Sequence, residues 1–195
     1  AGRRPRHEVI AKQISEFPIS RIRFSPYDPE KLVSCGRENI RFWRIKRAHL
    51  PGCPVILNEF ARGCEYTDLA FEAAYGAAPS SGGADRRLFV CSTAGTVAQV
   101  NYDTRELECV FRLHDGPVRA IAVNEGFCVT GSDDKYLRVW PLDFSEFFLE
   151  AEHEGPVTAV DISWNGLGIL VGTSVGTVGM LDAATHAYQT LLRSH

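Results

Sequence analysis

A segment of ten residues occurs twice in this chain, 39 positions apart, and this repeat constrains the fold more than any other feature. Residues 114–123 read HDGPVRAIAV and residues 153–162 read HEGPVTAVDI, so a histidine, an acid, Gly-Pro-Val and alternating apolar residues recur in one order. Each copy is followed by a β-rich run, a polar or glycine turn and another β-rich run. A period near 40 residues indicates an array of similar supersecondary units.

The same template extends toward the N-terminus and divides the whole chain. Units are expected at about residues 8–57, 58–112, 113–151 and 152–195, with an insertion at 72–87 in the second. Each unit has three short apolar runs of period 2, and a fourth run follows at 55–57, 107–111, 147–149 or 188–192. Helical periodicity does not persist anywhere. The sequence therefore predicts an all-β chain of about four four-stranded units, and the low-complexity insertion predicts a flexible loop.

Four-stranded units with a leading histidine and a third strand that ends in tryptophan resemble the WD40 family of β-propellers. The third unit is the most similar, because His114, Thr130, Asp134 and Trp140 fall where this family places a hydrogen-bonded tetrad. A buried histidine needs partners for both ring nitrogens, and the other three side chains can form a closed network with it. The resemblance therefore implies a structural role for these four residues.

The other units depart from this pattern. The fourth unit keeps His153 but has Val171, Val175 and Leu181 in place of the threonine, aspartate and tryptophan. The first unit keeps Trp43, and the second keeps none of the four. We expect these three units to depend on their strand patterns and to be less rigid than the third.

The first unit carries a second resemblance. Residues 24–43, FSPYDPEKLVSCGRENIRFW, are similar to a unit of EMAP-like microtubule-associated WD40 proteins and of large ciliary and centriolar WD40 proteins. The resemblance implies a place in the cytoplasm and cytoskeleton, at a centriole or the base of a cilium. It also implies protein partners such as tubulin, microtubules and centriolar scaffold proteins. WD40 rings typically hold four to eight blades, so we expect these blades to belong to a larger propeller and to contact its remaining blades.

Charge is distributed unevenly along the chain. The formal net charge is −3, but residues 1–50 contain 12 of the 21 Lys and Arg and have a net charge of +7. The remaining residues have a net charge of −10, and such a split can steer an acidic partner to one end. In the geometry that the resemblance implies, loops of both propeller faces display candidate protein-binding residues, and the basic residues that crowd the first unit are further candidates. These are Arg37, Arg41, Arg44, Lys46, Arg47, Asp115, Arg119, Lys135 and Glu154.

Catalytic and cofactor sites are not expected. Residues 172–176, GTSVG, satisfy the G-x-S-x-G pattern of a nucleophile elbow, but that elbow needs a helix after Ser174, and a strand is predicted there. The six cysteines show no C-x-x-C pair, so we interpret them as structural thiols and expect no metal. Glycines interrupt the most apolar stretch, residues 165–181, so we expect no membrane-spanning helix and no membrane partner.

The sequence leaves three functions to compare. The preferred hypothesis is a non-catalytic protein-interaction scaffold of a microtubule-based structure, involved in centriole wall or cilium assembly. A generic WD40 adaptor, such as a ubiquitin-ligase substrate receptor, is an alternative. A nucleic-acid-associated WD40 protein is another, since arginines crowd the first unit, but the sequence pI of about 6.1 and the lack of interleaved aromatics make nucleic acid an unlikely partner.

Overall fold

The structure is a computed structural model, and it describes residue 9, residues 11–72 and residues 86–193. The described chain is all-β, apart from the short 3-10 helix η1 (Asn58–Ala61). Its sixteen strands form four antiparallel sheets of four strands each, and the strands of each sheet follow one another in chain order. The prediction of WD40-type blades with four strands each is confirmed in its architecture.

Sheets one and two come from the N-terminal half of the chain. Sheet one contains β1 (Ile19–Phe24), β2 (Lys31–Gly36), β3 (Asn39–Arg44) and β4 (Gly52–Pro54). Sheet two contains β5 (Tyr66–Phe71), β6 (Arg87–Ser92), β7 (Thr96–Asn101) and β8 (Leu107–Arg112). The insertion predicted at 72–87 joins β5 to β6, and its residues 73–85 lie outside the described residues.

Sheets three and four contain the two copies of the repeated segment. Sheet three contains β9 (Val118–Val123), β10 (Phe127–Ser132), β11 (Tyr136–Pro141) and β12 (Leu149–Glu152). Sheet four contains β13 (Val157–Ile162), β14 (Gly168–Thr173), β15 (Val178–Asp182) and β16 (Tyr188–Leu192). In both sheets the repeated segment ends in the first strand, which explains why its apolar residues alternate.

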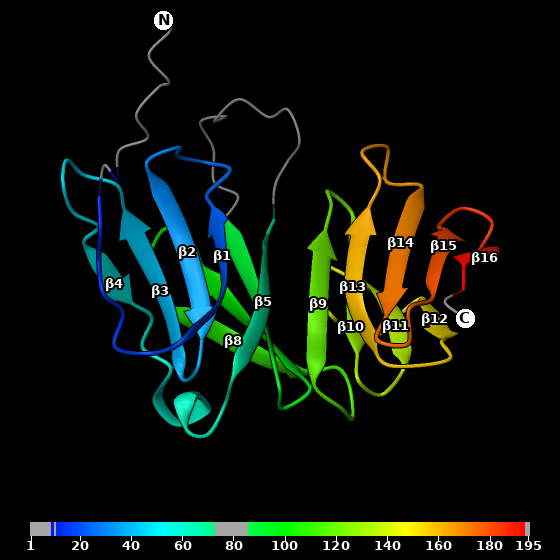
Figure 1. The fold of residues 1–195 in the computed structure, drawn as a ribbon. Coiled ribbons are helices and arrows are strands. Elements are labelled where there is room, and N and C mark those ends of the chain that lie inside the picture. Colours follow the sequence, from blue (N-terminus) through cyan, green and yellow to red (C-terminus); the bar gives the residue numbers. More distant parts are fainter. Residues whose placement is uncertain (1–8, 10, 73–85, 194–195) are drawn as a thin grey trace, which may run out of the picture.

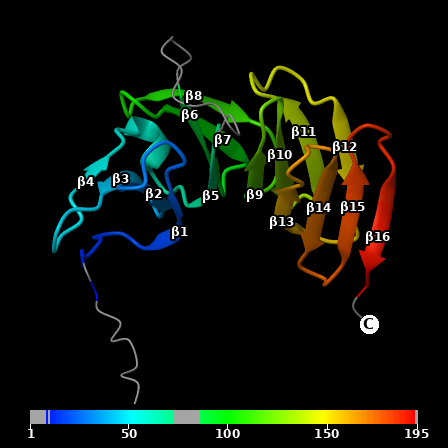
Figure 2. The same ribbon diagram turned by 90° about the horizontal axis from the view of Figure 1, so that it is seen from above.

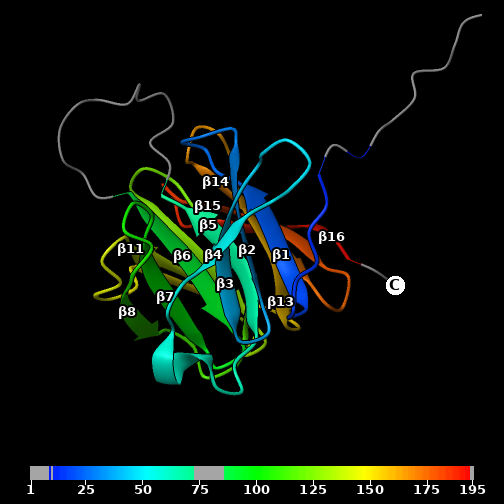
Figure 3. The same cartoon turned by 90° about the vertical axis from the view of Figure 1, so that its left-hand side faces the viewer.

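The four sheets stand side by side around a common axis. Figure 1 shows the first strands β1, β5, β9 and β13 near the middle of the molecule, and each of these strands contacts the next. Seen from above, the sheets form an open arc with sheet one and sheet four at its two ends (Figure 2). Figure 3 looks onto sheet one, with the other sheets behind it.

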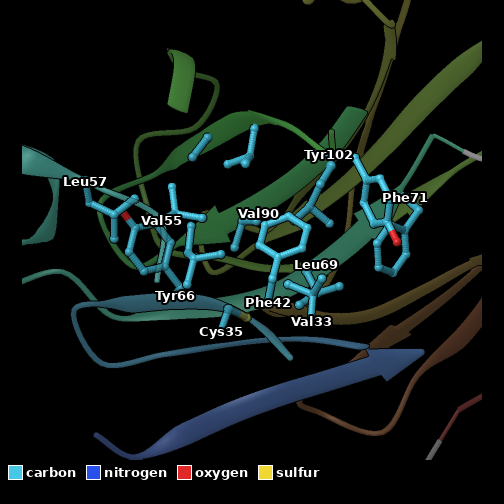
Figure 4. Packing of buried hydrophobic residues seen from close by; sticks show 14 residues of the cluster. Val33, Cys35, Phe42, Val55, Leu57, Tyr66, Leu69, Phe71, Val90 and Tyr102 are labelled. Carbon is cyan, nitrogen blue, oxygen red and sulfur yellow. The ribbon is translucent and has the colours of Figure 1, made fainter. Parts of the chain in front are cut away.

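Apolar side chains fill each space between neighbouring sheets. Val33 and Phe42 of sheet one meet Leu69 and Val90 of sheet two in the first cluster, as Figure 4 shows. A second cluster lies between sheets two and three, and a third between sheets three and four. Each inner sheet is therefore buried on both faces, which accounts for the nearly continuous burial along β6 and β10.

The first strand of each sheet has an irregular register at one end of its pairing with the second strand. In β5, the pairing shifts between Tyr66 and Leu69, as at a β-bulge. Such a bulge redirects side chains, and here the Thr67 hydroxyl donates a hydrogen bond to the carbonyl of Val118 in the next sheet (2.5 Å). The Ser20 hydroxyl of β1 donates to the carboxylate of Glu65, just before β5 (3.2 Å). The irregular strand starts thus tie neighbouring sheets together.

Two predicted fourth strands are wrong in position. In sheet one the strand is β4, residues 52–54, instead of 55–57, because Val55 and Leu57 are drawn into the core between sheets one and two. In sheet three the strand begins at Leu149 instead of 147, because Phe147 packs edge-on against Trp140 and does not join the ladder. In both cases apolar residues that were expected to form the fourth strand lie outside it and pack against neighbouring side chains.

Candidate protein-interaction surfaces

Sheet three contains a continuous chain of side-chain hydrogen bonds that joins four residues. The Trp140 indole N–H donates to the Thr130 hydroxyl (2.9 Å), and that hydroxyl is 2.8 Å from Nε2 of His114. Nδ1 of His114 lies 2.9 Å from a carboxylate oxygen of Asp134, at the turn between β10 and β11. One tautomer satisfies the whole set, with Nδ1–H donating to Asp134 and Nε2 accepting from Thr130. The four residues are therefore a structural network that joins the entry of β9 to β10 and β11.

The pKa shifts of His114 and Asp134 favour a neutral imidazole beside an ionised carboxylate at neutral pH. Burial lowers the pKa of His114, while Asp134 opposes that shift, and we infer that the ring is neutral. Burial by itself would raise the pKa of Asp134, but the backbone N–H of Tyr136 and the His114 ring hold it below its ordinary value. A neutral ring between a hydroxyl and a carboxylate is a stabilising arrangement and not a general base in an open site.

The other sheets keep only parts of this network. In sheet four, Nδ1 of His153 lies 3.2 Å from the Tyr188 hydroxyl, and its buried Nε2 has no hydrogen-bond partner among the described residues. In sheet one, the Trp43 indole N–H donates to the Ser34 hydroxyl (2.8 Å). The sequence analysis did not predict Ser34 as a hydrogen-bond partner of Trp43, although Ser34 aligns with Thr130 in the repeat.

Asp68 is a second residue that the sequence reading missed. This buried aspartate on β5 forms ion pairs with Arg21 (2.9 Å) and Arg23 (3.2 Å) of β1, and Arg23 also donates a hydrogen bond to it. Its other oxygen accepts from the backbone N–H of Ile121 on β9 (3.3 Å). One carboxylate thus links sheets one, two and three near the axis. The signal in the sequence is an aspartate where the repeated segment has alanine.

Five of the nine candidate binding residues lie toward the edge that contains the turns between second and third strands. They are Arg37, Asp115, Arg119, Lys135 and Glu154. Arg119 is bound to Asp133 (2.6 Å), and Glu154 is bound to Arg193 (3.0 Å). This edge therefore displays mixed charges that partly neutralise one another.

Three other candidates lie at the opposite edge of sheet one. Arg44 ends β3, and Lys46 and Arg47 belong to the exposed loop between β3 and β4. Together with Val9, Glu30, Ile45 and Ala48 they line an open hollow of about 910 Å³. Only Arg44 has an acidic partner in the described part of the chain, and that pair with Glu30 is long, at 3.6 Å. This loop is a basic surface with free charge, and we call it the β3–β4 basic loop.

Arg41 is separated from the other basic candidates. It lies in the middle of β3, and its guanidinium group stacks over the Trp43 ring, 5.3 Å from the ring centre. Its buried Nε has no hydrogen-bond partner among residues that the structure describes. Arg41 therefore belongs to the open face of sheet one and not to the basic loop.

The remaining chemical candidates have structural positions. Ser174 follows β14 and precedes β15, so the G-x-S-x-G pattern is a β-hairpin turn, as predicted. All six cysteines are free thiols, and burial raises the pKa of Cys35 to about 12. In the described ranges, no cluster of three or more His, Cys, Asp and Glu could hold a metal ion. No helix of the same residues is long and apolar enough to cross a membrane.

This architecture and its tetrad define the class of protein. Residues 105–141, which include most of sheet three, match the family model described as WD domain, G-beta repeat. The chain belongs to the WD40-repeat family, and its four sheets are blades of the WD40 propeller type.

Individual relatives are similar over nearly the whole chain. The chain is 40% identical to WD repeat-containing protein 90 of Xenopus tropicalis over 96% of its length, and 36% identical to the Homo sapiens protein of that name. It is 39% identical to centriole proteome protein 16 of Chlamydomonas reinhardtii over 98% of its length. The chain spans only 11%, 12% and 10% of these three relatives, respectively.

Proposed function

We propose that this chain is part of a non-catalytic scaffold that binds proteins in a microtubule-based structure, at a centriole or the base of a cilium. The β3–β4 basic loop engages an acidic protein surface, such as that of a microtubule. The acidic later sheets remain available to a second protein. The observation that carries this proposal is the basic loop at one end of a chain with net negative charge, in which Lys46 and Arg47 have no acidic partner among the described residues.

Two further findings support the proposal. The names of two relatives associate them with centrioles or cilia: centriole proteome protein 16 and cilia- and flagella-associated protein 251, both of Chlamydomonas reinhardtii. A third relative, from Rattus norvegicus, is named echinoderm microtubule-associated protein-like 2 and is 26% identical over 96% of the chain. WD40 repeats as a class offer loops for protein contact and bring no chemistry of their own.

Co-sedimentation with microtubules at several salt concentrations tests the proposal. We expect binding at low ionic strength that weakens as salt is added, because exposed charges are screened over about 10 Å at 0.1 M. Reversing three charges of the basic loop, in the variant Arg44→Glu, Lys46→Glu, Arg47→Glu, should abolish that binding. Binding that is absent at low salt, or unchanged in this variant, would contradict the proposal.

A matched control separates location from total charge. The variant Arg62→Glu, Arg105→Glu, Arg112→Glu changes net charge by the same amount, at exposed positions outside the basic loop. We expect this variant to retain most of the binding. Equal loss in both variants would show that only net charge matters and that the loop is not a site.

A further inference from the structure

The outer strands of the four sheets differ in how their free edges are protected. β4, β8, β12 and β16 each end a sheet, so one side of each strand pairs with no other strand among the described residues. β4 has only three residues and ends in Pro54. β8 contains Glu108 and Arg112, and β12 contains Glu150 and Glu152. Short length, proline and charge are features by which edge strands avoid pairing with another chain.

β16 has none of these features. Its five residues, Tyr188–Leu192, contain no charge and no proline, and all of them except Thr190 are exposed. Leu192, for example, is 62% exposed. Thr190 occupies the position of the repeat at which sheet three has Glu150 and sheet one has Pro54. An uncharged edge strand of this kind is suited to pairing with another strand.

The surroundings of β16 leave this edge accessible. The strand lies at the outer end of the arc, with no other described strand on its outer side (Figure 2). Arg193 follows the strand directly, and its guanidinium group lies 3.0 Å from the carboxylate of Glu154. The positive charge nearest to the edge is therefore already paired within the chain.

The sequence of β16 is complementary to a second copy of itself. Two β16 strands related by a two-fold axis are antiparallel, and one register pairs all five residues of each strand. In this register Thr190 lies opposite Thr190 of the second copy, Tyr188 opposite Leu192, and Gln189 opposite Leu191. Pairs of threonines and pairs of aromatic with aliphatic side chains are favourable cross-strand neighbours, and no like charges meet.

We propose that β16 is a homodimerisation edge, at which two copies of this chain join their fourth sheets into one continuous antiparallel sheet. The pairing gives the main-chain groups of both edges hydrogen-bond partners, and it covers part of Leu191 and Leu192. A two-fold edge pairs with its own equivalent, so the assembly stops at two copies. The β3–β4 basic loop lies in sheet one, at the other end of the arc, so this inference does not depend on the microtubule proposal.

Sedimentation equilibrium of the 195-residue chain tests this proposal. We expect the average mass to rise from that of a monomer to that of a dimer as the protein concentration increases. Thr190→Lys places two like charges opposite each other and should weaken the association by at least about tenfold, and Thr190→Glu should do the same. An equimolar mixture of the two variants should recover the dimer, because opposite charges then face each other.

Met180→Lys is the matched control. It adds the same charge to the exposed face of sheet four and not to its edge, so we expect it to dimerise as the unmodified chain does. Loss of the dimer in Met180→Lys would assign the association to that face and would overturn the proposal. A chain that stays monomeric at every concentration, or a mixture of the two Thr190 variants that does not recover the dimer, would overturn it as well.

Disulfide formation gives an independent readout of the register. Opposed residues of antiparallel strands have Cα atoms about 4.5 to 5.5 Å apart, a distance that a disulfide can span. In a background with Cys53, Cys64 and Cys109 replaced by Ser, Thr190→Cys should form a disulfide-linked dimer at least about tenfold faster than Ser174→Cys in an exposed hairpin. Equal rates would contradict the proposed pairing. Thr190→Cys is a small and neutral change, so this measurement decides the question if a charged variant fails to fold.

Discussion

Sheets three and four begin with nearly the same ten residues and fold into the same four-stranded unit, but they are stabilised differently. In sheet three the buried histidine has a partner on each ring nitrogen, and both faces of the sheet are covered. In sheet four the buried histidine has one partner, Tyr188, and one face is exposed. The strand pattern is therefore sufficient for a blade, and the polar network is an addition to it.

This difference predicts that local stability is higher in sheet three than in sheet four. Sheet three has a buried network in which every polar group is hydrogen-bonded, and both of its faces are packed. Its local unfolding should therefore require a high free energy. Sheet four has a ring nitrogen with no partner among the described residues and has exposed apolar side chains, so we expect it to open before sheet three. The predictions below begin with the largest expected effect on this comparison.

Trp140→Ala should have the largest effect. The side chain is buried, packs against Phe144 and Phe147, and donates to Thr130, so its truncation should cost about 3 to 5 kcal/mol. Leu181→Ala, at the equivalent position of sheet four, should cost about 2 kcal/mol, because a sheet with one open face can relax around the cavity. Urea unfolding, with hydrogen exchange to locate the loss, measures both. Equal costs would contradict the difference between the two sheets.

Two reciprocal substitutions, Thr to Val in sheet three and Val to Thr in sheet four, should change the stability of the chain in opposite directions. Thr130→Val removes the hydroxyl between Trp140 and His114 and should destabilise by about 1 to 3 kcal/mol, because it leaves buried polar groups unpaired. Val171→Thr places a hydroxyl at the equivalent position, where we expect it to bond to Nε2 of His153 and to stabilise by about 0.5 to 1.5 kcal/mol.

The two variants have almost the same shape change, so each is a control for the other. Thermal melts of both, alongside the unmodified chain, provide the measurement. If Val171→Thr destabilises as Thr130→Val does, the added hydroxyl does not reach His153 and sheet four does not share the geometry of sheet three.

Acidification should weaken both sheets through their histidines. Burial lowers the pKa of His153 and of His114, so the unfolded chain binds more protons than the folded chain. The stability that comes from keeping these two histidines neutral is therefore fully present above about pH 6.5, the ordinary histidine pKa. It is lost as the pH falls toward the lowered pKa values of the folded chain. Asp134 has a lowered pKa as well, but its contribution is lost only below about pH 3.9.

Urea unfolding at pH 7.5 and pH 5 measures this dependence. His153→Gln should reduce the loss of stability on acidification, because it removes one titrating group and keeps a polar side chain. Replacing His114 in addition should reduce the loss further. A pH dependence that survives both replacements would show that other groups control it.

The repeat in the sequence was sufficient to predict the four sheets, because they depend on local periodicity, and the resemblance to the WD40 family supplied the tetrad positions. Ala120 and Asp68 show what that reasoning cannot predict. They occupy equivalent places in β9 and β5, but Asp68 is bound by Arg21, which is 47 residues away in the chain. Only the packing of sheet one against sheet two brings these charges together.

The misplaced fourth strands have a similar cause. Val55 and Leu57 alternate as a strand would, and no local signal distinguishes an edge strand from a connection that packs into a core. The open hollow beside the β3–β4 basic loop also includes Val9, from a segment far from that loop in sequence. Contacts of this kind depend on tertiary packing.

The smallest effect is expected for the surface ion pairs of the two sheets. Arg119 is bound to Asp133 in sheet three through two of its nitrogens, and Arg193 is bound to Glu154 in sheet four at 3.0 Å. All four side chains are substantially exposed, so solvent screens both pairs. A double-mutant cycle on Arg119 and Asp133 should give a coupling below about 1 kcal/mol that decreases with salt. The matching cycle on Arg193 and Glu154 should give a smaller coupling, because that pair is the more exposed and has a single contact. A larger coupling in sheet four would mean that its exposed charges, and not its strand pattern, hold the end of the arc together.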